Sequence, residues 1–111
     1  MSVARQVWQE FSPRDGEELA CRDDGIIEVT IDGVLEGFGI DSDVPFGLYV
    51  SIMADRMQTV FMEGRQQMDP DCPLHPAAHP LHSDVVNGAA AWLCPSTNSL
   101  VRYMRVTAEA T

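Results

Sequence analysis

The most regular alternation of apolar and polar positions lies in the stretch GIIEVTIDGVLEGFGI, residues 25–40. Two runs rich in β-branched residues flank Asp32-Gly33, a pair that favours a two-residue hairpin turn because both positions tolerate positive φ. The register set by this turn pairs Ile31 with Val34, Val29 with Glu36 and Ile27 with Phe38. The pattern therefore predicts a β-hairpin.

A longer pattern follows in DSDVPFGLYVSIMADRMQTVFMEGRQQ, residues 41–67. Its apolar positions recur at helical spacing and predict one amphipathic helix from about 44 to 67; they are Phe46, Val50, Met53, Met57, Val60 and Phe61. Asp43 is the expected cap and Pro45 lies in the first turn, while Gly47 and Gly64 weaken the two ends. The apolar stripe is expected to pack against the first hairpin. The alternative is a dimer seam, because methionine adapts to varied partners.

The rest of the chain predicts three further elements. Residues 2–11 fit a short helix, and HSDVVNGAAAWLCPSTNSLVRYMRV, residues 82–106, fits a second hairpin about Asn87-Gly88 followed by a strand over 100–106. Residues 107–111 are expected to fray. The elements together indicate a small single α+β domain, residues 1–111, with two β-hairpins, one central amphipathic helix and a short N-terminal helix.

The charge of the chain changes the range of partners to consider. Of 111 residues 17 are acidic and seven are basic, which gives a formal net charge of −10. Such a charge argues against direct binding to nucleic-acid phosphates and suits a partner with a basic surface. No apolar run is long enough to span a membrane, and the N-terminus lacks the order of a secretory signal, so a cytoplasmic protein is expected.

The acids are concentrated in one part of the sequence, because ten of the 17 lie within residues 15–43 and only Arg22 opposes them. One interpretation is a solvated hairpin edge, since charges protect edge strands from aggregation. The other is an acidic face that occupies a partner's basic site, as an inhibitor or a mimic of nucleic acid would. The residues expected to bind in that case are Asp23, Asp24, Glu28 and Asp32.

Candidate chemistry is confined to DCPLHPAAHPLH, residues 71–82, which holds all three histidines, and to Cys94. Cys72 and His75 have the two-residue gap of a zinc knuckle. A two-residue turn at Asn87-Gly88 pairs Ser83 with Trp92, His82 with Leu93 and Leu81 with Cys94. This register places His82 on the opposite face of the strand pair from Cys94. The same alternation, continued along the chain, assigns His79 to the face that carries Cys94.

The predicted ligand set is therefore Cys72, His75, His79 and Cys94, with His82 in reserve, and zinc is the expected ion. Four protein ligands would make a closed, structural site. Two other interpretations remain open: solvated loop histidines, and buried thiols or a disulfide in an exported protein. Three cysteines are an odd number for a closed disulfide set, and no role follows for Cys21.

The residues CPLHP…HPL…VNGAAAWLCP resemble a degenerate zinc ribbon, in which CPxH stands for the first knuckle and WxCP opens the second. Similar short tails occur in small proteins of actinobacteria and their phages. The resemblance covers residues 71–95 and implies a zinc-ribbon-like C-terminal hairpin segment over 71–106. The CPST that follows the tryptophan offers no second ligand.

Catalysis is not expected. Cys72 with His75 or His79 could form a thiolate–imidazole pair, but no glycine-rich oxyanion or phosphate loop accompanies it. The expected function is a non-catalytic interaction or assembly protein with a structural zinc, virion-associated if a phage encodes it. Its partner would be another protein, or a second copy bound through the 44–67 helix with Met53 and Met57 at the contact.

Overall fold

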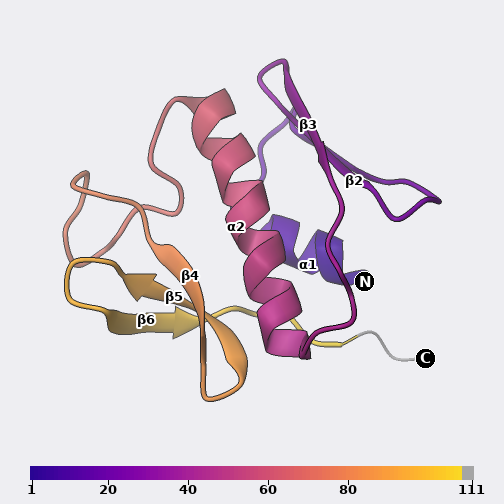
Figure 1. Cartoon of the computed structure of the whole chain (residues 1–111). Coiled ribbons are helices and arrows are strands. Elements are labelled where there is room, and N and C mark those ends of the chain that lie inside the picture. Colours follow the sequence, from indigo (N-terminus) through magenta and orange to yellow (C-terminus); the bar gives the residue numbers. More distant parts are fainter. Residues whose placement is uncertain (109–111) are drawn as a thin grey trace.

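A long helix, α2 (Phe46–Arg65), lies between two antiparallel sheets in the computed structural model, which describes residues 1–108 (Figure 1). The N-terminal sheet has the order β1-β2-β3, with strands Glu18–Cys21, Ile27–Ile31 and Val34–Phe38. The C-terminal sheet has the order β4-β5-β6, with strands His82–Val86, Ala89–Cys94 and Ser99–Tyr103. A short helix, α1 (Val3–Gln9), packs on α2. The α+β class is confirmed, but each sheet has three strands.

The N-terminal sheet contains the predicted hairpin and one strand that was not predicted. Ile31 pairs with Val34, Val29 with Glu36 and Ile27 with Phe38, so the expected register is confirmed. Strand β1 is a short edge strand whose residues are mostly exposed, and Leu19 is its partly buried apolar residue. Because an edge strand of this kind shows little alternation, the pattern in ELAC does not reveal it.

The ends of both helices differ from the expected ones. Helix α1 is shorter than residues 2–11, and the Ser2 side chain caps it by accepting a hydrogen bond from the Arg5 amide at 3.1 Å. Helix α2 begins after Pro45, which occupies the N-cap position without a side-chain hydrogen bond. The prediction that Asp43 caps this helix was therefore wrong, because proline's fixed φ starts the helix two residues later. Gln66 ends α2 in the left-handed conformation.

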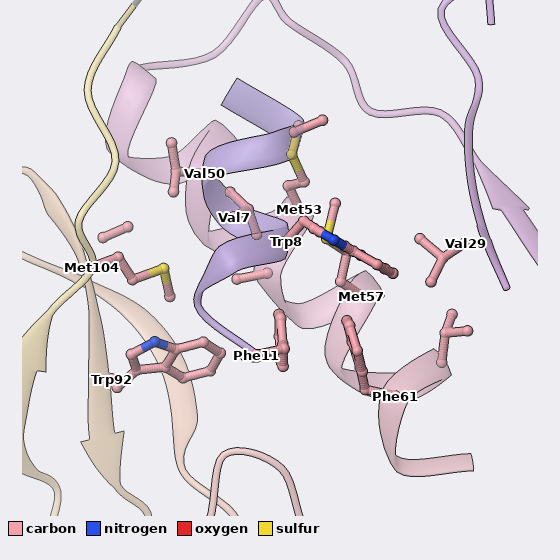
Figure 2. Close-up of a cluster of buried hydrophobic side chains, with 14 of the residues drawn as sticks. Val7, Trp8, Phe11, Val29, Val50, Met53, Met57, Phe61, Trp92 and Met104 are labelled. Atoms are coloured by element: carbon pink, nitrogen blue, oxygen red, sulfur yellow. The ribbon is translucent and has the colours of Figure 1, made fainter. Parts of the chain in front are cut away.

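The apolar stripe of α2 forms the centre of the core (Figure 2). Met53 and Met57 have no exposed surface. The prediction that these two residues bind a partner was therefore wrong, because both sheets and α1 cover the stripe. Phe46, at the first turn of α2, is 40% exposed and is not part of the core.

An aromatic cluster connects α1 and α2 with the C-terminal sheet. The rings of Phe11 and Phe61 are stacked with centroids 4.5 Å apart, and Trp8 lies 5.0 Å from Phe61. The Trp92 and Phe11 rings are nearly perpendicular with centroids 5.7 Å apart, and the Trp92 indole N–H donates to Glu10 at 2.9 Å. Because these rings come from three elements, the core is continuous across both helices and β5 (Figure 2).

The end of the described chain returns to α1. The Thr107 amide donates to the side chain of Gln6 at 2.8 Å, and the Gln6 amide donates to the Thr107 carbonyl at 3.0 Å. The predicted fraying therefore does not begin at Thr107, while residues 109–111 lie outside the described residues. No helix among the described residues is long and apolar enough to cross a membrane.

Arg65, near the end of α2, is the centre of a buried ionic network. Its guanidinium donates to both carboxylate oxygens of Glu17, from Nε at 2.8 Å and from Nη2. Its Nη1 donates to the Asp69 carboxylate at 2.9 Å. The guanidinium also donates to the carbonyls of Phe11 and Ser12 and lies 4.5 Å from the centre of the Phe61 ring. The network ties the loop between α1 and β1 to the end of α2.

Glu17 in this network makes stability depend on pH. The hydrogen bond from Arg65 holds the pKa of Glu17 below its ordinary value of 4.5, although burial opposes this effect. A group whose pKa is lower in the folded state stabilises the fold above its unfolded pKa, and this contribution is lost as the pH falls through the folded pKa.

We expect Glu17→Gln to be less stable than the wild type by about 2 kcal/mol at pH 7, because the buried Arg65 loses one counter-charge. This difference should shrink as the pH falls below about 4.5. The measurement is the free energy of urea unfolding of both proteins across pH, with Glu36→Gln in the exposed part of β3 as the control. Parallel pH profiles for wild type and Glu17→Gln would contradict the role of Glu17.

Candidate metal centre

The candidate ligands come from two places that the fold brings together. Cys72, His75 and His79 lie in the segment 66–81, which connects α2 to β4, whereas Cys94 is the last residue of β5. Ser83 pairs with Trp92 and His82 with Leu93, so the predicted register of the second hairpin is confirmed. The segment and the β5–β6 turn lie at the same end of the molecule in Figure 1.

Backbone hydrogen bonds give the segment a defined shape without helix or strand. The Leu81 amide donates to the Pro70 carbonyl at 2.7 Å, and the Cys72 amide donates to the His79 carbonyl at 3.3 Å. The buried side-chain amide of Gln58 in α2 donates to the carbonyls of Asp69 and Leu81, at 3.0 and 2.6 Å. These bonds close the segment at its base and fix it to α2.

The tip of the segment is held by a carboxylate and by tight turns. Both oxygens of Asp71 accept from the Ala77 amide, at 3.1 and 3.2 Å. The His75 amide donates to the Cys72 carbonyl at 3.2 Å, and the Ala78 amide donates to the His75 carbonyl at 3.1 Å. The first of these turns carries the CPLH knuckle, so it directs the Cys72 and His75 side chains toward the same point.

Four ligand atoms converge there and lie within 4.8 Å of one another: the sulfurs of Cys72 and Cys94, Nδ1 of His75 and Nε2 of His79. The two nitrogens are 3.3 Å apart, and the three sulfur–nitrogen distances between hydrogen-bonding neighbours are 3.4 to 3.9 Å. A tetrahedral zinc with bonds of about 2.0 Å to nitrogen and about 2.3 Å to sulfur requires a nitrogen–nitrogen separation of about 3.3 Å and a sulfur–nitrogen separation of about 3.5 Å. The arrangement therefore fits one zinc-sized ion.

The ring of His79 is oriented by its second nitrogen. Nδ1 lies 3.2 Å from the Pro80 carbonyl oxygen, which can only accept a hydrogen bond, so Nδ1 carries the proton. Nε2 therefore presents its lone pair to the cluster. A metal-bound histidine commonly donates its other N–H to a carbonyl or carboxylate in this way, which fixes the tautomer that can bind the ion.

The local turn at Cys94 favours the thiolate form. Hydrogen bonds lower the pKa of the Cys94 thiol to about 6: the side chain of Thr97 has the largest effect, and the backbone amides of Thr97 and Ser96 and the Cys72 thiol add to it, while burial opposes them. The Asn98 amide also closes this turn by donating to the Cys94 carbonyl at 2.7 Å. Because the thiolate is the form that binds metal, the turn prepares Cys94 as a ligand.

The structure separates the predicted quartet from the other candidates. Cys72 and Cys94 are fully buried free thiols, so they do not form the disulfide of the second alternative, and the buried thiols of that alternative are present beside the two histidines. His82, the reserve ligand, is exposed on β4 and lies 3.9 Å from Asp84, outside the cluster. Alternation along β4 is the reason, because His82 points away from the face that carries Cys94. Cys21 is exposed on β1, in the other sheet.

The acidic residues expected to bind a basic partner belong to the N-terminal sheet and its turns. Arg22 forms ion pairs with two of them, at 2.8 Å to Asp24 and 3.6 Å to Glu28. Asp23 and Asp32 are exposed in the β1–β2 and β2–β3 turns. The ion pairs reduce the acidic character of this region, and binding of a basic partner stays a prediction.

Comparison of the chain with protein-family models, curated proteins and solved structures found no match. The interpretation of the site therefore depends on the chemistry of its own residues.

Proposed function

We propose that the chain binds one zinc ion through Cys72, His75, His79 and Cys94, and that it is a non-catalytic interaction or assembly protein. The convergence of four ligand atoms at distances suited to one tetrahedral ion carries this proposal. Two thiolates and two imidazoles are a ligand set typical of structural zinc sites, whereas Mg²⁺ and Ca²⁺ prefer oxygen ligands.

The closed ligand set supports a structural ion. Four protein ligands fill a tetrahedral site, whereas a catalytic zinc keeps one position for water or substrate. The ion would join the segment before β4 to the last residue of β5, two parts of the chain that no disulfide connects. We infer that its role is to hold the C-terminal sheet and the segment 66–81 in one shape, on which a partner can bind.

The test is the metal content of the purified protein, measured by mass spectrometry after dialysis. We expect about one equivalent of zinc in the wild type, and less than about a tenth of this in Cys72→Ser, because serine is a far weaker ligand than thiolate for zinc. Cys21→Ser removes an exposed cysteine outside the cluster and is expected to keep the full equivalent.

His79→Ala and His82→Ala form a second matched pair. His79 lies in the cluster and His82 outside it, so we expect loss of zinc from the first variant and retention in the second. A wild type purified from zinc-containing medium with no bound metal, or zinc retained in Cys72→Ser, would overturn the proposal.

A further inference from the structure

An open hollow of about 790 Å³ lies beside α1, away from the metal centre. Its wall combines the polar side of α1, the residues just after this helix and the chain that follows β6, with the side chains Gln6, Gln9, Glu10, Ser12, Arg102 and Arg105. Two hydrogen bonds between Gln6 and Thr107 hold the end of the described chain against α1 (Figure 1). Pockets for small molecules measure roughly 300 to 1,000 Å³, so the hollow has the size of a ligand site.

A buried carboxylate supports one side of this hollow. The Glu10 side chain is 5% exposed and accepts three hydrogen bonds: from the Trp92 indole at 2.9 Å, from the Arg105 backbone amide at 3.0 Å, and from Nη1 of Arg102. Glu10 is the one acid in the wall among the described residues. Because its oxygens are occupied by these donors, Glu10 positions both arginines.

The two arginines keep most of their hydrogen-bond donors for a ligand. A guanidinium has five N–H donors, and the bond to Glu10 uses one of those of Arg102, whose side chain is 40% exposed. Arg105 is exposed, and within residues 1–108 its guanidinium has neither an ion pair nor a hydrogen bond. Two guanidiniums and one carboxylate therefore leave a surplus of positive charge at the hollow.

This surplus persists although the whole chain is acidic. Arg102 and Arg105 are the only charged residues in the range 85–108, whereas ten of the 17 acids lie within residues 15–43. Exposed charges are screened over about 8 Å at physiological ionic strength, so the nearest groups decide which ligand the hollow attracts. The formal charge of −10 opposes a long polyanion, but a small anion needs only the two arginines.

We propose that the hollow binds a small phosphate ester whose organic part carries hydroxyl groups. The planar guanidinium matches phosphate oxygens with paired N–H donors, and a phosphate group has three such oxygens, enough for two arginines at once. A carboxylate has two oxygens and suits a single guanidinium. The phosphate would lie between Arg102 and Arg105.

The rest of the wall suits the organic part of the ester. Gln9 and Ser12 are exposed, and an amide and a hydroxyl can each donate and accept hydrogen bonds, as the hydroxyl groups of a ligand do. Free phosphate would use the arginines alone and would leave the remaining volume to water. We therefore expect the ester to bind more tightly than inorganic phosphate.

The test is an NMR titration of the isotope-labelled wild type with ribose 5-phosphate, inorganic phosphate and ribose at pH 7 in about 0.05 M salt. We expect saturable shifts of the Arg105 and Thr107 amides with ribose 5-phosphate, with a Kd below about 1 mM. Inorganic phosphate should bind at least tenfold more weakly, and ribose should not bind in this range. Raising the salt to about 0.5 M should weaken the binding of the ester, because salt screens the arginines.

Arg105→Gln is the decisive variant, and it should bind ribose 5-phosphate at least tenfold more weakly than the wild type. The exposed Arg105 side chain has no bond within the described chain, and its backbone amide can still donate to Glu10, so the fold should be kept. Arg56→Gln is the matched control, because it removes one exposed positive charge from α2, outside the hollow, and should bind like the wild type. Arg105→Lys keeps the charge without the paired donors and should bind with intermediate affinity.

Three results would overturn the proposal: no saturable shift at Arg105 and Thr107, an Arg105→Gln variant that binds like the wild type, or ribose binding as tightly as its phosphate. Inorganic phosphate that binds as tightly as the ester would mean an adventitious ion only. Shifts confined to residues 72–79 would place the phosphate at the metal centre and would also overturn it. Zinc content is measured on the same samples, so Arg105-dependent binding by a metal-free wild type supports this site while the zinc proposal fails.

Discussion

Removal of zinc is expected to lower the midpoint of thermal unfolding by about 15 °C or more. A ligand that binds only the folded state at a free concentration about a thousand times its Kd stabilises that state by about 4 kcal/mol. For a domain of this size, one kcal/mol corresponds to roughly 4 °C. The effect should be large here because the ion would join the segment 66–81 to the last residue of β5, two parts of the chain that no disulfide connects.

The measurement is differential scanning calorimetry at pH 7 with and without an excess of a chelator. Cys94→Ser should unfold at the lower temperature under both conditions, since it cannot form the site. Cys21→Ser is the control and should respond to the chelator like the wild type, because Cys21 is exposed in the other sheet. A wild type whose unfolding midpoint is the same with and without the chelator would contradict a structural role for the ion.

Gly64→Ala is expected to destabilise the protein by at least about 3 kcal/mol, although alanine is the better helix former by about 1 kcal/mol. The reason is the close approach of α2 to β2. A Cβ atom at this position would lie 2.5 Å from the Ile31 carbonyl oxygen and equally near the Ile31 side chain. The obstacle includes backbone, so the helix or the sheet must move.

The measurement is urea unfolding of Gly64→Ala beside Gly37→Ala. At Gly37, in β3, the nearest atom to an added Cβ is the Ile26 side chain at 3.5 Å, which is ordinary contact. We therefore expect Gly37→Ala to be within about 1 kcal/mol of the wild type. A Gly64→Ala protein that is as stable as the wild type would show that the helix and the sheet can separate without cost.

The glycines of α2 also show what reasoning from the sequence could not reach. Gly47 and Gly64 were interpreted as weak points near the helix ends. In the structure Gly64 contacts Ile31, and Gly47 lies against the β4–β5 turn, where an added Cβ would be 3.0 Å from the Gly88 carbonyl carbon. Both glycines are positions at which a sheet approaches the helix, and a helical propensity scale contains no information about such a neighbour.

The features that the sequence predicted correctly are those with a local physical cause. The positive φ of Asp32 and Gly33, and of Asn87 and Gly88, sets a two-residue turn, and each turn then sets the register of its hairpin. That register also determines which side chains of β4 and β5 lie on the same face. On this basis His79, and not His82, was predicted to lie beside Cys94. The candidate site could therefore be assembled before the fold was known.

The tertiary structure alone decided the features that depend on residues distant in the chain. The methionine stripe of α2 would suit a core or a dimer seam equally well, and only its coverage by two sheets places Met53 and Met57 inside. Strand β1 exists because β2 offers it an edge, and Arg65 is buried because Glu17, 48 positions earlier, neutralises it. Periodicity and turn propensity are properties of neighbouring residues, whereas burial and charge pairing depend on which segments the folded chain brings into contact.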